Sequence, residues 1–407
     1  MEQFDIDAYA PKQMAARVEK AGVTKGSMDF FSTLVLAKMA GAFIGFGSAL
    51  YIYVIHDSTL SLGLTKLIGG LVFCLGLILV VVAGAELFTG NNLIVMAYVS
   101  RKVSLSQLFR NWGIVFTGNL IGSLTIVLLI FLSGHWMAGG AAVGAKTLLI
   151  ANEKVNLSLC QTFSRGILCN MLVCLAVWLC FSGRSVTDKI LAIIFPVMAF
   201  VTLGFEHSVA NMYFIPAGLL VKHNPVIVAR AQTMLGAVPL DLSRLTISGF
   251  LLNNLLPVTI GNIIGGSLLV AAIYWFVYLR GSAAEPVRRC MTGGPPTVAP
   301  HTSIAEAARV MGEHASGSVL VGETGKALGI LSEKDIVHKV IAAGRDPAAV
   351  TVDQVMSTPL ISVDIRASAY EVYRTMAKHQ IRHLLVTREG QQVGFVSVRD
   401  ILKNPII

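Results

Sequence analysis

The sequence predicts a mainly α-helical, polytopic membrane protein that carries a smaller α/β unit at its C-terminal end. Three observations lead to this fold class. Hydrophobic residues make up 54% and charged residues 14% of the 407 positions, a balance that soluble globular domains do not show. Nearly all of the apolar excess precedes residue 280. Beyond residue 296 the composition becomes that of an ordinary α/β domain, and an internal repeat begins.

Six apolar blocks each cover the roughly 20 residues that a membrane-spanning helix needs. The blocks are 29–56, 64–99, 110–133, 157–182, 188–220 and 249–279. The second and fifth are too long and too polar in the middle to be single helices, so we expect helices two and five to be broken. Residues 1–28 lack the layout of a cleaved signal peptide and are predicted to form an amphipathic cytoplasmic segment, either a lid at the mouth of a pore or a surface anchor.

Basic residues near the ends of the blocks indicate their orientation, because positive flanks tend to stay cytoplasmic. They precede block one and separate blocks two from three and four from five: Lys12, Arg17, Lys20, Lys25, Arg101, Lys102, Arg110, Arg184 and Lys189. Both termini and the α/β unit are therefore expected inside the cell, with the chain crossing a bacterial inner membrane several times. The basic connection 221–248 opposes this assignment. We interpret the net charge of +9 as a topology signal, with no nucleic-acid partner.

Two internal repeats divide the membrane part into halves. The pattern Gly-x-Glu-x-x-x-x-Asn occurs in both long blocks, at Gly84, Glu86 and Asn91 and at Gly204, Glu206 and Asn211. Polar groups are expensive at bilayer depth, so interruptions in corresponding places indicate a path for a solute. The strings 118–122 and 261–265 form a second pair, whose small residues we expect to serve close helix packing. With three spans each, the two halves insert with opposite orientation.

Three segments resemble the hallmark stretches of the formate/nitrite transporter family. They are Ala83–Thr89, Asn170–Trp178 and, most specifically, Gly204–Met212, which contains Phe-Glu-His-Ser-x-Ala-Asn; the resemblance extends over about residues 5–282. It implies an aquaporin-like six-helix protomer in a homopentamer, with one pore per protomer. It also implies that the solutes are small monovalent anions or their acids, chiefly formate and nitrite, with hydrosulfide and short carboxylates in some members.

The candidate pore residues gather around the two interruptions. His207 is predicted to lie at membrane depth at a helix break, where freed backbone groups can face only protein or a cavity. The hydroxyl of Thr89 in the other interruption could face it across the pore. The resemblance implies that one slit of the pore is lined by Leu87, Phe88 and Thr89. It also implies that the apolar constrictions on either side of the histidine are formed by Phe73, Leu77 and Phe200.

A bare carboxylate in a low-dielectric passage costs several kcal/mol, so the anion has to be compensated or neutralised. Lys154 could attract anions to the outer mouth, or it could be an ordinary snorkelling lysine. His207 could donate a hydrogen bond to the passing anion, or pass it a proton so that the neutral acid crosses. We favour proton transfer, which predicts that His207→Phe or His207→Ala abolishes pH-dependent uptake of a weak acid in a folded protein.

The remaining polar residues of the membrane part are expected to be structural. Glu86 and Glu206 would accept hydrogen bonds from exposed backbone or from the opposing broken helix. The asparagines Asn91, Asn170 and Asn211 would satisfy freed backbone groups or contact the solute. The cysteines show no metal-binding spacing and are interpreted as packing residues: Cys74, Cys160, Cys169, Cys174, Cys180 and Cys290.

After a predicted linker at 281–296, residues 297–403 repeat at an offset of 65, with Ser303, Glu306 and Arg309 matching Ser368, Glu371 and Arg374. The strings 329–335 and 394–400 resemble the end of cystathionine-β-synthase (CBS) domains, so we expect one CBS copy at 297–345 and another at 351–403. This resemblance implies binding of an adenine nucleotide (ATP, ADP or AMP). The residues that suit it are Ser332, Asp335, Ser397 and Asp400, with phosphate contacts from Arg382 and His383.

Taken together, the sequence predicts a channel or transporter for small monovalent anions and no enzyme, with no required cofactor and no metal site. Nucleotide binding to the CBS pair is expected to alter pore opening, which requires different affinities for two states. The alternatives are a channel for hydrosulfide, short carboxylates or a neutral solute with a purely structural CBS pair. A water or ammonium channel is a closer rival than an adenylate-sensing scaffold, and the basic Lys154 favours anions over both.

Overall fold

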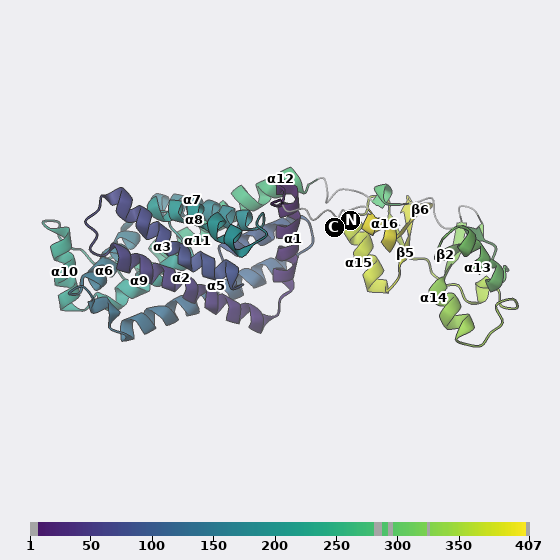
Figure 1. The fold of residues 1–407 in the computed structure, drawn as a ribbon, viewed down its shortest axis with the longest axis horizontal. Coiled ribbons are helices and arrows are strands. Elements are labelled where there is room, and N and C mark those ends of the chain that lie inside the picture. The colour runs from purple at the N-terminus through teal and green to yellow at the C-terminus, as the bar shows by residue number, and fades with distance from the viewer. Residues whose placement is uncertain (1–6, 281–286, 292–295, 324–325, 404–407) are drawn as a thin grey trace. The chain divides into compact units, whose positions relative to one another are not determined.

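The computed structural model describes residues 7–280, 287–291, 296–323 and 326–403. The chain divides into two compact units, Met1–Arg280 and Gly281–Ile407, which we describe separately (Figure 1). Residues 281–286 and 292–295 of the predicted linker, and 1–6 of the predicted N-terminal segment, lie outside the described residues.

The first unit, the membrane unit, is helical throughout its described part. In its first half the elements are α1 (Pro11–Ser27), α2 (Phe30–Ile55), α3 (Leu62–Val82), η1 (Gly90–Ile94), α4 (Val95–Val99), α5 (Leu105–Leu132) and η2 (His135–Met137). The second half contains α6 (Ala142–Asn156), α7 (Leu159–Cys180), α8 (Val186–Thr202), α9 (Ser208–Val221), α10 (Pro225–Leu235), η3 (Gly249–Leu255), α11 (Leu256–Ile263), η4 (Ile264–Ala272) and α12 (Ile273–Tyr278). We call the two ends of this unit the α1 end and the α6 end (Figure 1).

Five helical stretches within the described ranges are long and apolar enough to cross a membrane: α2, α3, α5, α7 and the continuous segment Gly249–Tyr278. The count reaches six if α9 and α10 are taken as one span, but α10 turns away from α9 by 113°. We therefore assign the remaining crossing to α8 and α9, which are separated only by residues 203–207. The expected six-span fold with broken second and fifth spans is confirmed.

Local sequence sets where these helices begin and where two of them break. The side chains of Asp29, Ser61, Ser104, Ser158 and Ser185 each accept an amide hydrogen bond at the start of a helix. The breaks follow α3 and α8, where Gly84 and Gly204 adopt φ of +78° and +70°. Residues with a Cβ rarely adopt these angles, so glycine permits the chain to leave the helix within the membrane.

The two halves pack in the same way around close helix crossings. A Cβ on Gly122 of α5 would lie 1.9 Å from the carbonyl oxygen of Lys38 in α2, and one on Gly265 would lie 2.2 Å from that of Ile167 in α7. Larger side chains would force these backbones apart. The packing role expected for both glycine pairs is therefore confirmed.

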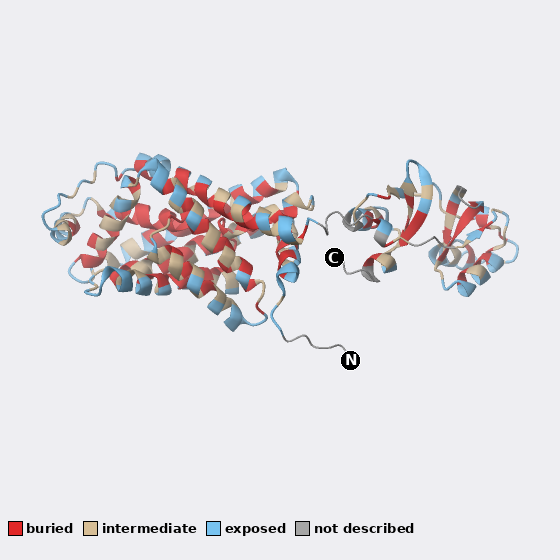
Figure 2. Cartoon of the chain, turned by 90° about the horizontal axis from the view of Figure 1, so that it is seen from above, coloured by how far each residue is buried: buried red, intermediate tan, exposed pale blue. Residues whose placement is uncertain are grey.

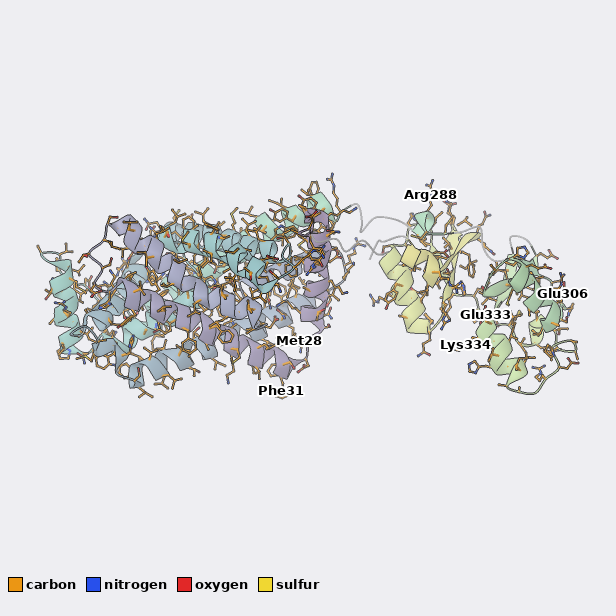
Figure 3. The ribbon with its side chains drawn as sticks, in the orientation of Figure 1. Met28, Phe31, Arg288, Glu306, Glu333 and Lys334 are labelled. Carbon is orange, nitrogen blue, oxygen red and sulfur yellow. The ribbon has the colours of Figure 1, made fainter. Side chains whose placement is uncertain are left out.

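Burial separates a packed interior from an apolar periphery (Figure 2). The interior of the membrane unit is a large cluster that includes Ile44, Phe73, Leu148 and Phe200. Large apolar side chains also remain exposed, and Phe31 near the start of α2 is 76% exposed (Figure 3). An apolar surface of this extent suits lipid or neighbouring subunits.

The second unit repeats one βαββα arrangement. The first copy contains β1 (Thr297–Val298), α13 (Ile304–Glu313), β2 (Ser318–Glu323), β3 (Lys326–Ser332) and α14 (Glu333–Ile336), continued by η6 (Val337–Ile341). The second contains β4 (Ser362–Asp364), α15 (Ala369–His379), β5 (His383–Arg388), β6 (Gln391–Ser397) and α16 (Val398–Lys403). Each forms a three-stranded sheet, β1-β2-β3 or β4-β5-β6, with a parallel first pair and an antiparallel second pair.

A short segment that precedes each copy packs into the core of the other copy. Val287 and Cys290, around η5 (Val287–Arg289), are buried in the core of the second copy, whereas Val352 and Val355, around η7 (Val352–Gln354), are buried in the core of the first. Val287 and Val352 are separated by the repeat offset, so equivalent segments are exchanged. The predicted linker 281–296 therefore includes residues that complete a core, which we did not expect from its composition.

Candidate functional site

His207 lies at the start of α9, directly after the second helix break, and its ring makes two hydrogen bonds. The backbone N–H of Ala210 donates to Nδ1 at 3.0 Å, and Nε2 lies 2.9 Å from Thr89 Oγ1. Since Nδ1 accepts, we assign the proton of the neutral ring to Nε2, which then donates to Thr89. Both side chains are buried, so the structure joins the two interruptions through one polar contact.

Aromatic rings lead from this contact toward the α6 end. Phe200 stacks on the His207 ring with centroids 5.9 Å apart, and Phe73 contacts Phe200 at 5.9 Å. Phe214, which the sequence interpretation missed, stacks on Phe73 at 6.5 Å and contacts Tyr51 at 5.8 Å. The predicted constriction residues Phe73 and Phe200 thus belong to one ring cluster beside the histidine.

The other predicted apolar residues are buried at or near the first break. Leu77 and Leu87 are each 3% exposed. Phe88 packs against Phe116 and Trp112, with ring centroids 5.1 and 6.1 Å apart. Thr89 thus follows directly after two buried apolar side chains, Leu87 and Phe88.

A buried ion pair lies next to His207 on the side of α6. Lys154 Nζ donates to Glu206 Oε1 at 2.7 Å, and Asn211 and Asn254 donate to Glu206 Oε2 at 2.7 and 3.0 Å. Asn254 also donates to the backbone carbonyl of Lys154 at 3.0 Å. The lysine expected to attract anions is therefore paired with a carboxylate, which reduces its long-range field.

The same network occurs at the first break. Lys25 Nζ donates to Glu86 Oε1 at 2.5 Å, Asn91 donates to Glu86 Oε2 at 2.7 Å, and Asn111 donates to the carbonyl of Lys25 at 3.2 Å. Lys25 is thus the counterpart of Lys154, and α1 is the counterpart of α6. The sequence contains a signal for this correspondence: each lysine is followed four positions later by the N-cap residue of the next helix, Asp29 for α2 and Ser158 for α7.

The carboxylates differ from expectation in their partners. Exposed backbone or the opposing broken helix was expected to donate to Glu86 and Glu206, whereas lysine and asparagine side chains do so instead. A carboxylate buried at this depth has a large desolvation cost, which a neighbouring ammonium group offsets better than neutral amides do. The lysine on the preceding amphipathic helix was the missing element.

Two further asparagines hold the freed backbone in place. Asn119 accepts from the N–H of Phe88 at 2.9 Å and donates to the carbonyls of Ala37 and Glu86 at 2.8 and 2.9 Å. Asn262 accepts from the N–H of Ser208 at 2.9 Å and donates to Gly166 and Glu206 at 2.7 and 3.0 Å. Sequence reasoning assigned both segments to packing alone, and missed these amides at the second position of each Gly-Asn-x-x-Gly string.

Asn170 shows the expected contact with freed backbone, since it donates to the carbonyls of Thr89 and Asn262 at 3.3 and 2.7 Å. Its Oδ1 atom and that of Asn211 are buried without a hydrogen-bond partner among the described residues, as is the hydroxyl of Ser208. Buried polar atoms are usually paired. Because the two amide oxygens can only accept, they leave hydrogen-bonding capacity for a donor such as water and not for a bare anion.

The N-terminal helix is docked against protein. Met14 and Val18 of α1 are buried in a cluster with Met96 and Trp178. Lys102, in the connection after α4, pairs with Glu19 of α1 at 2.7 Å. These contacts, on one face of the helix, make α1 part of the membrane unit, and a helix that only rests on a lipid surface would lack them.

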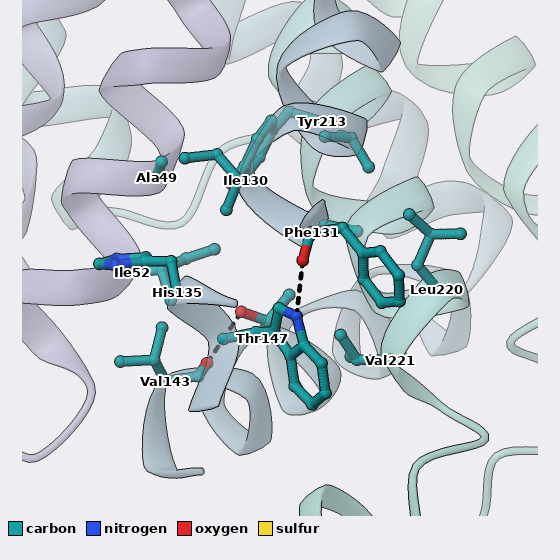
Figure 4. A pocket seen from close by; sticks show the side chains of 13 residues that line it. Ala49, Ile52, Ile130, Phe131, His135, Val143, Thr147, Tyr213, Leu220 and Val221 are labelled. Atoms are coloured by element: carbon teal, nitrogen blue, oxygen red, sulfur yellow. Dashed lines mark hydrogen bonds between the residues drawn. The ribbon is translucent and has the colours of Figure 1, made fainter. Parts of the chain in front are cut away.

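A cavity of about 30 Å³ lies near the α6 end and is lined by apolar side chains, with Tyr213 and His135 at its wall (Figure 4). Its indole and threonine groups are engaged locally, because Trp136 donates to the carbonyl of Phe131 and Thr147 to that of Val143, both at 2.8 Å. None of the predicted pore residues lines this cavity. The cavity is therefore separate from the contact between His207 and Thr89.

In the CBS unit, the first predicted carboxylate is heavily engaged. Asp335 accepts from Ser332 and Ser357 and pairs with Lys339 at 2.7 Å. Partial burial would raise the pKa of Asp335, but the hydrogen bonds from Lys339, Ser332 and Ser357 outweigh it and hold the pKa below its ordinary value. The first copy thus neutralises its carboxylate internally.

The second copy brings its predicted residues together differently. Asp400 accepts from the hydroxyl and N–H of Ser397 at 2.6 and 2.8 Å. Burial lowers the pKa of His383, and the nearby charges of Asp400 and Arg382 act on it in opposite directions. Ser318 occupies the position of His383 in the first copy, so the two copies offer different chemistry.

A family model described as formate/nitrite transporter matches residues 12–276 of this chain, and a CBS domain model matches residues 287–342 and 352–406. The chain belongs to the formate/nitrite transporter family. This membership agrees with the six spans and the two breaks, and the second match shows that the family domain is followed by two CBS domains.

Several similar proteins are named formate channels or formate transporters. The chain is 44% identical to formate channel FocA of Escherichia coli K12 over 278 residues, which cover 68% of this chain and 96% of that protein. It is 38% identical to formate channel FocA of Haemophilus influenzae over 267 residues, 65% of this chain and 92% of that protein. A probable formate transporter of Methanothermobacter thermautotrophicus is 40% identical over 290 residues, 67% of this chain and 96% of that protein.

Solved structures agree with this relationship. A pentameric formate channel with formate bound superposes with a TM-score of 0.56 at 42% identity, covering 62% of this chain and 98% of its own. An ion channel of the same family superposes with a TM-score of 0.55 at 27% identity, covering 65% of this chain and 98% of its own. These similarities place the chain among channels and transporters, which are not enzymes.

Proposed function

We propose that the membrane unit forms a pore for formate and similar small monovalent anions, with His207 and Thr89 as its central polar contact. The observation that carries the proposal is the 2.9 Å contact between Thr89 Oγ1 and His207 Nε2, where the two broken helices meet within apolar walls. In this proposal, the Nε2–H group exchanges Thr89 for the carboxylate of the passing solute as its hydrogen-bond acceptor. The pentamer of the related formate channel supports assembly as a homopentamer.

The hydrogen bonds of His207 bear on the two mechanisms weighed from the sequence. To give a proton to the anion, the ring must first be cationic, with hydrogens on both nitrogens. The N–H of Ala210 already donates to Nδ1, so a proton there displaces the bond that caps α9. This cost favours a neutral ring that donates a hydrogen bond from Nε2, and we assign His207 this role in place of proton transfer.

The paired charges on either side support passage of an anion in both directions. Lys25 and Lys154 lie at the two breaks, and each ammonium group donates to a glutamate. The basic flanks at the α1 end favour a cytoplasmic location for that end and for both termini, in a bacterial inner membrane. An entering anion would therefore meet a lysine before the apolar section from either side.

A flux comparison tests the proposal. Purified protein in liposomes should conduct formate and nitrite, and hydrosulfide and ammonium measured in the same preparation define the selectivity. Flux of ammonium alone would contradict the assignment to anions. If His207 acts as a donor, the formate flux divided by the concentration of formate anion should stay nearly constant from about pH 6 to pH 8. Obligatory proton exchange predicts instead that this ratio rises steeply as the pH falls.

We also propose that the second CBS copy binds an adenine nucleotide that regulates the pore. Asp400, Ser397, His383 and Arg382 supply a carboxylate for ribose hydroxyls and donors for phosphate. The first copy is the weaker candidate because Gly317 and Ser318 occupy the positions of Arg382 and His383 there. Equilibrium binding of ATP and AMP to the full chain should be lost in Asp400→Asn and retained in Asp335→Asn, and formate flux should change when nucleotide is added on the side of the CBS unit.

A further inference from the structure

Two basic side chains of the membrane unit, Lys66 and Arg165, both lie close to Gly204 at the second helix break. They are separate from the contact between His207 and Thr89. Lys66 lies in the second turn of α3, and its ammonium group is 3.7 Å from the place that a Cβ on Gly204 would occupy. Arg165, in the second turn of α7, donates from Nη1 to the carbonyl of Gly204 at 3.4 Å. The carbonyl of Arg165 also accepts from the N–H of Glu206 at 3.3 Å.

Lys66 shares a face of α3 with the predicted constriction residues. Phe73 and Leu77 follow it at positions i+7 and i+11, which is the spacing of residues on one side of a helix. Seven residues correspond to a rise of about 10 Å along the axis. Lys66 therefore lies about two turns outside Phe73, toward the α6 end, on the side of α3 that carries the pore residues.

Neither Lys66 nor Arg165 forms an ion pair with a carboxylate of the residues that the structure describes. In this they differ from Lys25 and Lys154, which each have a glutamate. A third cation, Lys146 in α6, lies close enough to Lys66 to feel its charge. Burial lowers the pKa of Lys146, Glu153 raises it, and the positive charge of Lys66 lowers it. Lys66 and Arg165 are both only partly buried, so their charges stay accessible to an anion that enters from the α6 end.

The first half of the chain has no such pair at its break. Lys25 and Lys154 differ by 129 positions and Glu86 and Glu206 by 120, so the counterpart of Arg165 is Leu36 and the counterpart of Lys66 is Val186. The N–H of Glu86 donates to the carbonyl of Leu36 at 3.3 Å, just as Glu206 does to Arg165. The break thus forms without either cation, which argues against a purely structural role for them.

We propose that Lys66 and Arg165 form an additional anion-binding subsite in the vestibule at the α6 end, which holds a small oxyanion before it reaches the constriction at Phe73. The inference rests on the proposed function, because it assumes that the pore conducts such anions. A guanidinium group matches a planar carboxylate with two parallel hydrogen bonds, and the ammonium group adds a second charge. The α1 end lacks the subsite, so half-saturating concentrations for entry from the two ends should differ.

Initial rates of formate entry in liposomes of defined protein orientation test the subsite. For entry from the α6 end, Lys66→Gln and Arg165→Gln should each raise the half-saturating formate concentration about fivefold at low ionic strength, the size of an exposed charge contact. The maximal rate should stay unchanged, and the difference should shrink in about 0.5 M salt. Lys66→Arg, which keeps the charge, should behave like the unchanged protein.

Arg110→Gln is a matched control, because Arg110 at the α1 end donates to the carbonyl of Met28 at 3.0 Å in a similar way. It should leave entry from the α6 end unaltered. Sulfate, used as an oxyanion too large to cross, should inhibit entry of formate into the unchanged protein and lose this effect when both Lys66 and Arg165 are replaced by Gln.

Two results would overturn the subsite: equal half-saturating concentrations in the unchanged protein and both variants, or equal inhibition by sulfate with and without the two cations. An unchanged protein that conducts no formate would instead contradict the proposed function. The two failures are therefore distinguishable in one set of measurements.

Discussion

Replacing Asn262 by alanine should destabilise the second helix break and stop transport. The amide of Asn262 bonds two backbone groups that the break removes from regular helices, the N–H of Ser208 and the carbonyl of Glu206, and it also donates to the carbonyl of Gly166 in the unbroken helix α7. Alanine leaves the first two groups buried within the spans without this partner, and Asn262 itself is fully buried. Water cannot replace the amide unless the region opens.

The size of the effect follows from counting these groups. An unsatisfied buried polar group costs about 1–3 kcal/mol, so two of them should lower the free energy of unfolding by at least about 2 kcal/mol. For a unit of this size, that loss corresponds to a fall in apparent melting temperature of roughly 4–8 °C. Asn119→Ala at the first break should behave alike, since Asn119 also serves three backbone groups.

Melting of the purified protein in detergent, followed by tryptophan fluorescence, measures this change, and formate flux in liposomes measures the functional loss. Asn156→Ala is the control, because Asn156 is exposed at the end of α6 and its amide donates to Asn152, one turn earlier in the same helix. Its replacement should shift stability by less than about 0.5 kcal/mol. Equal melting temperatures for Asn262→Ala and Asn156→Ala would refute the role assigned to the amide.

Three further outcomes are expected. Thr89→Val keeps the shape but removes the acceptor for His207, and should slow formate flux about tenfold with little change in melting; an unaltered rate would contradict the contact. Lys154→Gln should lower the melting temperature more than Lys25→Gln, because the Lys154 side chain is 15% exposed and that of Lys25 is 30% exposed; the reverse order would show that burial does not set the cost. The lowered pKa of Asp335 stabilises the CBS unit above the ordinary pKa of about 3.9, and this stability is lost as the pH falls below that value. Calorimetry of the full chain should therefore show a CBS transition whose acid sensitivity is reduced in Asp335→Asn.

The sequence was sufficient for the membrane fold because the underlying signals are strong. Apolar length and the repeated Gly-x-Glu-x-x-x-x-Asn pattern identified six spans with two breaks, and the constant offset in the C-terminal part indicated two CBS copies. In each case a single physical requirement, either burial from water or repetition of one unit, controls a long stretch of chain.

The site was less accessible to sequence reasoning, because it depends on contacts between distant residues. Lys25 appeared only as part of a basic flank, although it pairs with Glu86 across 61 positions. Asn119 and Asn262 stood between glycines that suggested packing, although their amides bond the freed backbone. The direction of each hydrogen bond at His207 required the position of the Ala210 N–H, which composition and spacing do not contain.

Formate flux through His207→Phe tests the central claim most directly. The claim is that the solute passes the imidazole at the meeting point of the two broken helices, so a ring without a donor should reduce formate flux in liposomes by at least about tenfold while the protein stays folded, with its melting temperature lowered only by the loss of the cap that His207 Nδ1 provides to α9. Flux equal to that of the unchanged protein, in a folded variant, would contradict the account and place the path of the anion elsewhere.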